Sequence, residues 1–316
     1  MIRIVAFGGG HGLATTLRAL RTLRKPFDLD ITAVVTVGDD GGSSGRLIAE
    51  RNVPVPPGDL RQALAALADD TDPTTRRTAE LFQHRFGGQD SLAGHPVGNL
   101  VLCGLMEQFG DPIAALDHAA TLVRAAGRVL PMAMKSVQIE ADVYGGDPAR
   151  PDEVVVVRGQ HQVAVARGVV HTVRLTPAPH ACAEAIEAVR RADWLIFGPG
   201  SWYTSVIPHL LVPEIADAVA GSAARKLVTL NLAMDQETHG LSLPDHLAAL
   251  TRYLPGLRAD VVLADGKAVG EPEPVHRAAE SLGARLVLAP VAVPDGAARH
   301  DPAALAVALE PILVDG

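Results

Sequence analysis

The chain begins MIRIVAFGGGHG over residues 1–12 and continues LATTLRALRTL over residues 13–23. A short apolar run ends in closely spaced glycines, and leucines then recur every three or four residues, as on one face of a helix. This order predicts a strand, a glycine turn and a helix. A second apolar run, Ile31 to Val37, completes a βαβ unit with both strands in one parallel sheet. The opening therefore indicates an α/β fold with a mainly parallel sheet flanked by helices.

Composition agrees with this fold class. Of the 316 residues, 48% are hydrophobic but only 3% are aromatic, so alanine, valine and leucine must fill the core, as they do between helices and parallel strands. An all-β sandwich fits this composition poorly. The length allows two domains or one large one. Because no linker or repeat divides the chain, we expect residues 1–316 to form a single domain.

Two stretches depart from a simple alternation of strand and helix. Residues 57–122 are rich in alanine and leucine and predict a layer of about four helices, with breaks near 71–73, 87–88 and 110–112. Residues 136–177 contain valine-rich pieces between glycine turns, which predict a small antiparallel β insertion.

After the insertion the alternation resumes, and we expect both α/β halves to share one sheet. The Pro- and Gly-rich patch 266–274 is expected to be a loop. Four further strands are predicted, at 194–197, 226–231, 260–263 and 285–288.

Charge and cysteine content argue against several classes of function. Lys and Arg number 28 against 36 Asp and Glu, a formal charge of −8, and no dense basic run is present to neutralise nucleic-acid phosphates. Two cysteines are too few for a disulfide framework. The longest nearly apolar stretch, 286–293, is far shorter than the ~20 residues that cross a bilayer. We expect a cytoplasmic homodimer without nucleic-acid or integral-membrane contact.

The first candidate site is the glycine turn, with Gly9, Gly10 and Gly12. Glycines let a diphosphate approach the backbone, and the following helix offers free N–H groups and a partial positive charge. A tight connection alone is the structural alternative. His11, within the turn, either donates to a phosphate or covers the turn.

The second candidate is DDGGSSGR, residues 39–46, at the end of the second strand. Asp39 and Asp40 are suited to hold a ribose hydroxyl, a divalent cation or a substrate hydroxyl, while Ser43 and Ser44 suit a phosphate or sugar. A flexible surface loop is the alternative. Asp39 follows Gly8 by 31 residues, whereas the acid of an NAD site follows by about 20, so the NAD pattern is imperfect.

Polar residues at two predicted helix starts are further candidates. Asp59 is placed to cap a helix, or to contact a ligand. Arg61 in the same first turn is not favoured by the helix dipole, which suggests another role. His95 precedes the other helix, and Asn99, one turn inside it, is a poor interior helix residue that needs a specific partner.

The loop GPGSWYTS, residues 198–205, follows a predicted strand directly and adds Gly198, Gly200, Ser201 and Thr204 as candidates. No group of residues has zinc-ligand spacing, and no nucleophile-elbow or P-loop motif is present. We therefore expect no metal site, and we interpret Cys103 as a core residue of an apolar helix.

Together the ordered motifs GGGHG, VTVGDDGGSSGRL, PPGDLRQ, AGHPVGNL, GRVLP and GPGSWYTSVIPHLLVPEI resemble the bacterial gluconeogenesis-factor family of YvcK-like proteins. The resemblance runs from Ile2 to about Asn231 and resumes near Arg299. This family shares a Rossmann-like superfamily with 2-phospho-L-lactate transferase, CofD. The resemblance implies binding of a nucleotide sugar of the UDP-N-acetylglucosamine type without required turnover or cofactor.

By position, the resemblance assigns ligand contacts to residues in the glycine, aspartate–serine and later loops. These are Gly9, Gly10, Gly12, Asp39, Asp40, Ser43, Ser44, Asn99, Gly198, Gly200, Ser201, Thr204 and Arg299. Asp59, Arg61, His95 and Asn231 lie in or beside the matched motifs and complete the candidate set.

The chain departs from the family pattern at four places. His11 replaces a threonine, segment 231–238 lacks a Pro-Gly pair, and 266–274 is short and lacks a tyrosine. Pro302 stands where some relatives have a phosphorylatable threonine, which excludes phosphorylation at that position.

Two functions follow, with a third less well supported. The first is a nucleotide-sugar-binding regulator that links carbon supply to cell-envelope synthesis and cell shape, with envelope-synthesis proteins as partners. The second is a phosphotransferase like 2-phospho-L-lactate transferase, in which Asp39 and Asp40 hold Mg²⁺ or a substrate hydroxyl. The segments GGSSGRL and PPGDLR favour the regulator. An NAD-dependent oxidoreductase would rest on the glycine turn alone.

Overall fold

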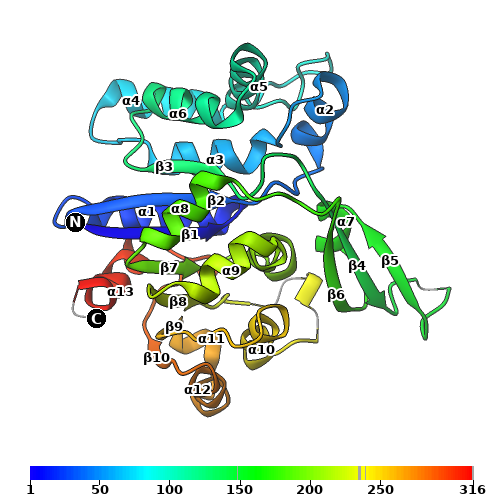
Figure 1. Ribbon diagram of the computed structural model, residues 1–316, viewed down its shortest axis with the longest axis vertical. Coiled ribbons are helices and arrows are strands. Elements are labelled where there is room, and N and C mark those ends of the chain that lie inside the picture. The colour runs from blue at the N-terminus through cyan, green and yellow to red at the C-terminus, as the bar shows by residue number, and fades with distance from the viewer. Residues whose placement is uncertain (148, 234–235, 239, 315–316) are drawn as a thin grey trace.

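A computed structural model describes residues 1–147, 149–233, 236–238 and 240–314. Its main sheet has seven strands in the order β10-β9-β8-β7-β1-β2-β3, and every neighbouring pair is parallel (Figure 1). This confirms the predicted fold class. The strands are β1 (Ile2–Gly8), β2 (Leu29–Val35), β3 (Arg128–Pro131), β7 (Trp194–Phe197), β8 (Arg225–Thr229), β9 (Val261–Ala264) and β10 (Arg285–Leu288).

The strand order reverses beside β1. The chain adds β2 and β3 on one side of β1, then returns to place β7 on the other side and continues outward to β10. Phe7 of β1 stacks on Phe197 of β7 with ring centroids 4.9 Å apart, which packs the two central strands together. Open parallel sheets bind ligands at such a reversal, outside the carboxyl ends of the strands.

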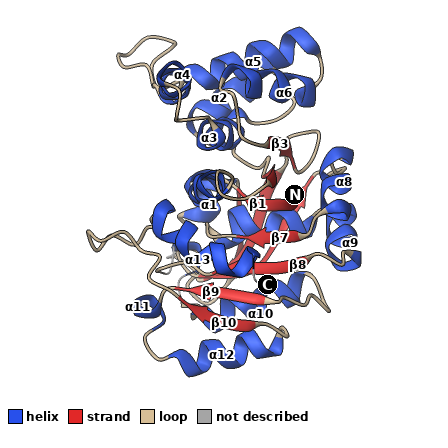
Figure 2. Cartoon of the chain, turned by 90° about the vertical axis from the view of Figure 1, so that its left-hand side faces the viewer, coloured by secondary structure: helices blue, strands red, loops and turns tan. Residues whose placement is uncertain are grey.

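Helices cover both faces of the sheet. Figure 2 shows α1 (Gly10–Leu23) and α13 (Pro302–Val314) on one face, and α8 (Ala183–Arg191) and α9 (Pro213–Gly221) on the other. Near the C-terminal strands lie α10 (Leu243–Tyr253), α11 (Gly266–Val269) and α12 (Pro272–Ser281). Three short turns, η1 (Trp202–Val206), η2 (Ile207–Leu211) and η3 (Gln236–Thr238), complete this half. No helix of the described residues is long and apolar enough to cross a membrane.

The expected helical layer consists of four helices, with breaks where the sequence predicts them. They are α3 (Pro57–Leu67), α4 (Pro73–Gln83), α5 (Val97–Phe109) and α6 (Pro112–Leu122). Asp72 and Asp111 cap α4 and α6 by accepting from the amides of Thr75 and Ile113. Figure 1 shows this layer beyond β3, at one end of the sheet.

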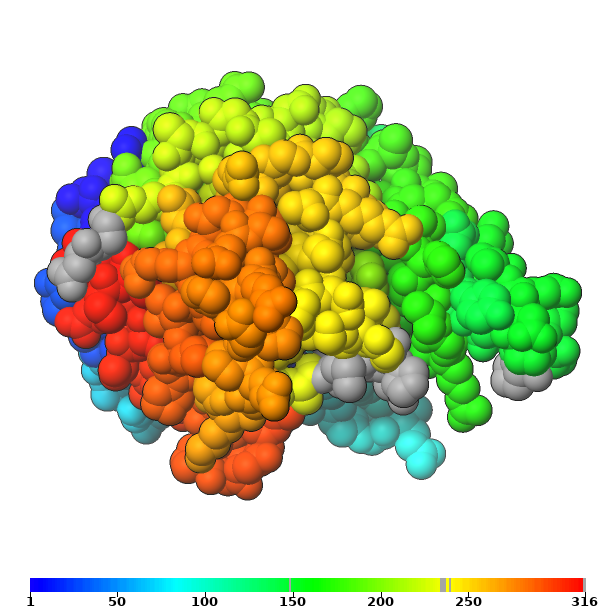
Figure 3. Space-filling model, turned by 90° about the horizontal axis from the view of Figure 1, so that it is seen from below, coloured from blue at the N-terminus to red at the C-terminus, as the bar shows by residue number. Residues whose placement is uncertain are grey.

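The predicted antiparallel insertion is also confirmed. It forms a separate sheet in the order β5-β4-β6, with β4 (Gln138–Tyr144), β5 (Val154–Arg158) and β6 (Val169–Thr176), and a short helix α7 (Gln160–Ala164) between the last two. In Figures 1 and 3 the insertion stands out from one side of the body.

Three local predictions differ from the structure. Residues 41–45, interpreted as a loop, contain the start of α2 (Gly42–Arg51), where Gly42 has φ +46° and the two serines are buried in the first turn. The strand β3 was not predicted from its four residues. Segment 266–274 holds α11 and the start of α12, because Asp265 caps α11 through the amides of Lys267 and Ala268.

Asp301 caps the last helix. Its Oδ1 accepts from the amides of Ala303 at 2.8 Å and Ala304 at 2.9 Å. We expect Asp301→Ala to lower the free energy of unfolding by about 1 kcal/mol. Asp217→Ala, on the exposed side of α9, is the matched control with little expected change. Urea unfolding measures both, and equal stability of the two variants would contradict the capping role.

Candidate functional site

The loops after β1 and β7 touch each other at the carboxyl edge of the sheet. A Cβ atom added to Gly12 would lie 2.2 Å from the carbonyl oxygen of Pro199 and 2.7 Å from the Cα of Gly200. Both neighbours are backbone atoms, so neither can rotate away. Glycine at position 12 is therefore a packing requirement, and it sets the distance between the two loops.

These loops border an open cleft of about 480 Å³. The volume lies within the usual range of small-molecule sites, ~300 to 1,000 Å³. Of the residues predicted from the sequence, the cleft brings together Gly9, Gly10, His11, Gly12, Gly200, Ser201, Asn231 and Arg299. Sequence reasoning missed Thr15, Ser205 and His300, which also line the cleft.

The amino end of α1 faces this cleft. Gly9 is the N-cap and has no side chain to accept a bond from the first amides of the helix. The Gly10 amide bonds to the Asp59 carboxylate beneath the turn. The remaining N–H groups and the helix dipole at such an end favour a negatively charged group. His11 is exposed in this turn, at the position where its ring can meet a ligand.

Asn231 fixes the loop on the other side. Its side-chain amide pairs with Gly200 in both directions, accepting from the Gly200 amide at 3.0 Å and donating to the Gly200 carbonyl at 2.9 Å. Gly200 itself has φ +150°, a conformation that favours glycine. Asn231 therefore positions the loop backbone at the rim of the cleft. Met234 and Asp235 of the unusual 231–238 segment lie outside the described residues.

Arg299 and His300 close the cleft from the C-terminal side. Arg299 is 67% exposed and pairs with Asp295 at 2.8 Å. Burial lowers the pKa of His300 to about 4, so its ring is neutral at physiological pH. This side of the cleft therefore presents one cation, held on an exposed and adjustable side chain.

A single carboxylate holds the segment that carries Arg299. Asp265 accepts from Lys267 and Ala268 on one oxygen, and from Val291 at 2.9 Å and Ala292 at 3.2 Å on the other. Burial would raise the pKa of Asp265, but these amide donors hold it below its usual value. The ionised carboxylate thus ties α11 to the C-terminal rim of the cleft.

A second group of predicted residues forms a buried network beside the cleft. Ser43 Oγ lies 2.7 Å from His95 Nδ1 and accepts from Asn99 Nδ2 at 3.0 Å. Asn99 Oδ1 accepts from Arg61 Nε at 2.8 Å, and Arg61 also bonds to Gln83. The expected specific partner of Asn99 is therefore present. The described residues of this network bind one another and do not line the cleft.

The buried Arg61 and His95 both have lowered pKa values. Burial lowers the pKa of Arg61 to about 10, with repulsion from Arg85 contributing. Burial and the neighbouring Arg46 lower the pKa of His95. His95 is therefore neutral near pH 7, whereas Arg61 stays charged inside the protein and needs the oxygens of Asn99 and Gln83.

Asp59 lies beneath the glycine turn. It does not cap α3, whose N-cap is Pro56, so the capping prediction is wrong. Its Oδ2 instead accepts from Thr36 Oγ1 at 3.2 Å, and a Cβ on Gly9 would come within 2.5 Å of the same oxygen. Asp59 supports the backbone of the turn from below, and Thr36 is a contributor that sequence reasoning missed.

Asp39 and Asp59 both have raised pKa values. Burial raises the pKa of Asp59 to about 7, and the nearby Asp39 carboxylate adds to the shift. Burial raises the pKa of Asp39 as well. Ser44 supports this corner by accepting from the Gly58 amide at 3.1 Å. A carboxyl group that exchanges its proton near neutrality therefore lies directly under the cleft.

Asp40 and Thr204 contact the insertion. Asp40 Oδ1 accepts from the His161 amide at 3.4 Å, and a Cβ on Gly159 would collide with the same carboxylate. The carbonyl of Thr204 accepts from Gln160 Nε2 at 3.2 Å. Gly198, at the end of β7, accepts from Thr16 Oγ1 through its carbonyl. These predicted residues hold the loops together and lie outside the cleft lining.

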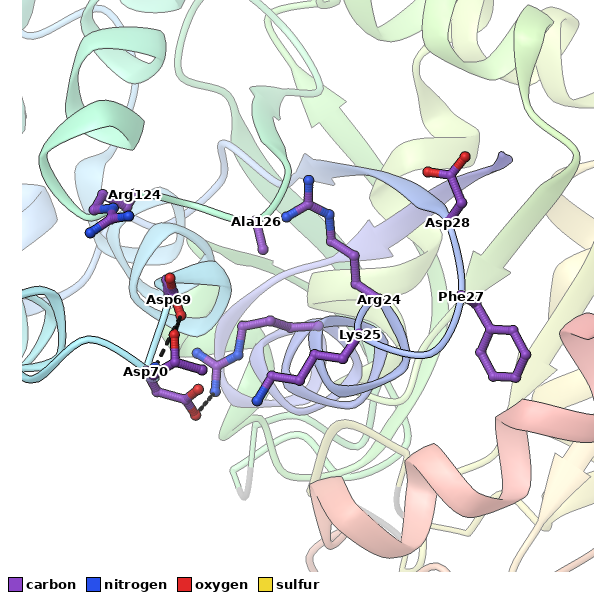
Figure 4. A pocket seen from close by; sticks show the side chains of 10 residues that line it. Arg24, Lys25, Phe27, Asp28, Asp69, Asp70, Arg124 and Ala126 are labelled. Carbon is purple, nitrogen blue, oxygen red and sulfur yellow. Dashed lines mark hydrogen bonds and ion pairs between the residues drawn. The ribbon is translucent and has the colours of Figure 1, made fainter.

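A different cavity, of about 640 Å³, opens at the opposite edge of the sheet. Figure 4 shows Arg24, Lys25 and Asp28 around it, where α1 ends and β2 begins. Arg21 is already paired with Asp70 there. Because this cavity lies at the amino ends of the strands and holds no glycine loop, the smaller cleft is the better candidate. Within the described residues, no group of three or more His, Cys, Asp or Glu side chains is arranged to hold a metal ion.

Comparison with known proteins gives the family. The family model described as 2-phospho-L-lactate transferase CofD matches residues 4–287. The chain belongs to the CofD family. This confirms the resemblance that the ordered motifs indicate.

The individual relatives are named for gluconeogenesis. A protein from Mycobacterium tuberculosis, provisionally named a gluconeogenesis factor, is 49% identical over 312 residues, which cover 97% of this chain and 89% of that one. The gluconeogenesis factor of Bacillus subtilis is 38% identical over 286 residues, covering 90% and 84%. A crystal structure of a UPF0052-family protein from Bacillus halodurans superposes with a TM-score of 0.85 at 33% identity, covering 98% of this chain and 100% of that one.

The raised pKa of Asp59 makes stability depend on pH. Between about pH 4 and 7 the folded protein keeps this proton whereas the unfolded chain has lost it, so the free energy of unfolding falls as pH rises, by at most about 1.4 kcal/mol per pH unit. Asp59→Asn, which stays neutral, should remove this part of the dependence and be more stable than the parent at pH 8.

Urea unfolding at pH 5.5 and pH 8 measures the effect, with the exposed Asp217→Asn as control. If Asp59→Asn loses stability with rising pH as steeply as the parent and the control, another group carries the dependence.

Proposed function

We propose that this protein is a gluconeogenesis factor whose cleft binds a nucleotide sugar of the UDP-N-acetylglucosamine type. Binding without turnover would make it a cytoplasmic regulator, linking carbon supply to envelope synthesis and cell shape through envelope-synthesis proteins. The relatives carry the name, and the cleft between the β1 and β7 loops supports the ligand class.

The observation that carries the proposal is the pair of glycine loops at the strand-order reversal. Gly9 to Gly12 bring bare backbone and the amino end of α1 to the cleft, which suits a diphosphate. Arg299 on the opposite rim supplies a guanidinium that can engage phosphate oxygens with two parallel hydrogen bonds. Asn231 and Ser201 add polar groups for a sugar or base.

Thermal unfolding with UDP-N-acetylglucosamine, GDP and NAD tests the ligand class directly. A ligand at ~100 times its dissociation constant adds about 2.7 kcal/mol to the stability of the folded state. We expect the UDP-sugar to raise the melting temperature most. No shift with the UDP-sugar, or a larger shift with NAD, would contradict the proposal.

Arg299→Lys tests the phosphate contact. A lysine keeps the charge but loses the fork of donors, so we expect the dissociation constant for UDP-N-acetylglucosamine to rise about tenfold. Arg258→Lys is the matched control, because Arg258 is exposed at the far edge of the sheet, before β9. Calorimetric titration of both variants decides, and parental affinity in Arg299→Lys would make this arginine structural.

A phosphotransferase is the second candidate, favoured by the family description itself. Asp39 and Asp40 would then hold a Mg²⁺ ion or a substrate hydroxyl. Asp40 accepts from the His161 amide outside the cleft lining, and Asp39 accepts from the Gly41 amide and has a pKa raised by burial, so both carboxylates suit a structural role better. Incubation with UDP-N-acetylglucosamine, Mg²⁺ and an alcohol as acceptor, followed by phosphorus NMR, separates the two. Transfer of the sugar phosphate to the acceptor hydroxyl would release UMP and mark a transferase, whereas an unchanged ligand supports the regulator.

A further inference from the structure

We propose that two copies of this chain associate through the outer edge of β5. The three-stranded sheets of the two copies would join into one six-stranded sheet across a two-fold axis. This interface is separate from the cleft and does not depend on the ligand proposed above.

The outer edge of β5 is unprotected. The strand lies at the end of the order β5-β4-β6, and its sequence VVVVR has no proline, glycine or bulge. Val154 is 54% exposed and Val156 46%. Edge strands of monomeric proteins are usually blocked by charges, prolines or bulges, because a bare edge pairs with another strand. The first four residues of β5 carry none of these devices.

The hydrogen-bond pattern shows which backbone groups point outward. Gly159 donates to the Ile139 carbonyl at 2.8 Å, and Gly145 donates to the Glu153 carbonyl at 3.0 Å. In an antiparallel pair, alternate residues bond to the neighbouring strand. The odd-numbered residues of β5 therefore bond to β4, and Val154, Val156 and Arg158 direct their N–H and C=O groups away from it.

These outward groups match a second copy of the same edge. If Val156 lies opposite Val156 of the second copy, then Val154 lies opposite Arg158 in both directions. All three pairs are then hydrogen-bonded pairs, each exchanging two bonds. Because the arrangement is antiparallel and centred on one residue, it has the two-fold symmetry of a closed dimer. A strand from another protein has no such built-in register.

The side chains are compatible with this register. The valines at the centre bury apolar surface against each other, and Arg158, whose side chain is 62% exposed, faces a valine of the second copy. Arg158 Nε already pairs with Glu140 of its own copy at 2.9 Å, so this charge is balanced without a partner across the axis. In this register no like charges face each other.

The shape of the molecule leaves room for this contact. In Figures 1 and 3 the insertion stands out from the body, with β5 on its outer side in Figure 1. The two bodies would lie at opposite ends of the joined sheet, beyond β6 of each copy. Because the contact is short, we expect a dimer dissociation constant in the micromolar rather than the nanomolar range.

The first test uses two matched valine substitutions. Val156→Lys places two ammonium groups at the two-fold axis and should raise the dimer dissociation constant more than tenfold. Val307→Lys changes a 71% exposed valine on α13 and should leave it unchanged. Analytical ultracentrifugation measures both, with circular dichroism as the check on folding. A monomeric parent at 100 μM, a Val156→Lys dimer as stable as the parent, or dissociation by Val307→Lys would overturn the proposal.

The second test examines the register with cysteines. Residues in a hydrogen-bonded pair have Cα atoms about 5.5 Å apart, within disulfide range, so Val156→Cys should cross-link two copies under mild oxidation. Val154→Cys, on the same edge, would be separated from its counterpart by four residues, on the order of 14 Å, and should not cross-link. Cys103 and Cys182 are buried. Equal cross-linking of the two variants, or none in Val156→Cys, would overturn the register.

Discussion

The close contact between Gly12 and the backbone of Pro199 and Gly200 is the constraint on which the rest of the site depends. It joins the loop after β1, in one half of the sheet, to the loop after β7, in the other half, where the strand order reverses. Any side chain at position 12 would separate the loops and widen the cleft. Asn231 then fixes one loop from the side, while Asp59 and Thr36 support the other from below. The cleft is therefore a product of backbone packing more than of its lining side chains.

The buried polar residues beside the cleft form a distinct network. Ser43, His95, Asn99 and Arg61 satisfy one another in the interior, and they join α2, α3 and α5. An unpaired charge in this position would cost several kcal/mol, so the arginine requires its oxygen partners. The protein thereby uses polar contacts to attach the helical layer to α2, the helix that follows β2.

Local patterns were sufficient to predict most of the fold. Apolar runs ending in glycine or aspartate marked β1, β2 and β7, and Ala- and Leu-rich stretches separated by breaks marked the four helices of residues 57–122. The start of α2 was missed because Gly-Gly-Ser-Ser has low helix propensity, and its serines become helical through long-range bonds to His95, Asn99 and Gly58. Long-range bonds also limited the prediction of the site. Motifs marked the candidate residues, but partners far away in the sequence decide whether a residue lines the cleft or supports it. Ser44 and Gly58 are 14 positions apart, and Ser43 and Asn99 are 56 positions apart.

The insertion has a thermodynamic consequence through its position in the chain. β5 ends at Arg158, and the very next residues, Gly159 to His161, contact Asp40 and the carbonyl of Thr204. A contact made at the edge of the insertion and a change in the loops after β2 and β7 therefore act on one continuous stretch of backbone. Such coupling is reciprocal. If a change in the loops favours one arrangement of this stretch, then holding the stretch in that arrangement favours the same change in the loops, by an equal free energy. The insertion is thus a second point from which the loops beside the cleft can be biased, without any contact with what the cleft holds.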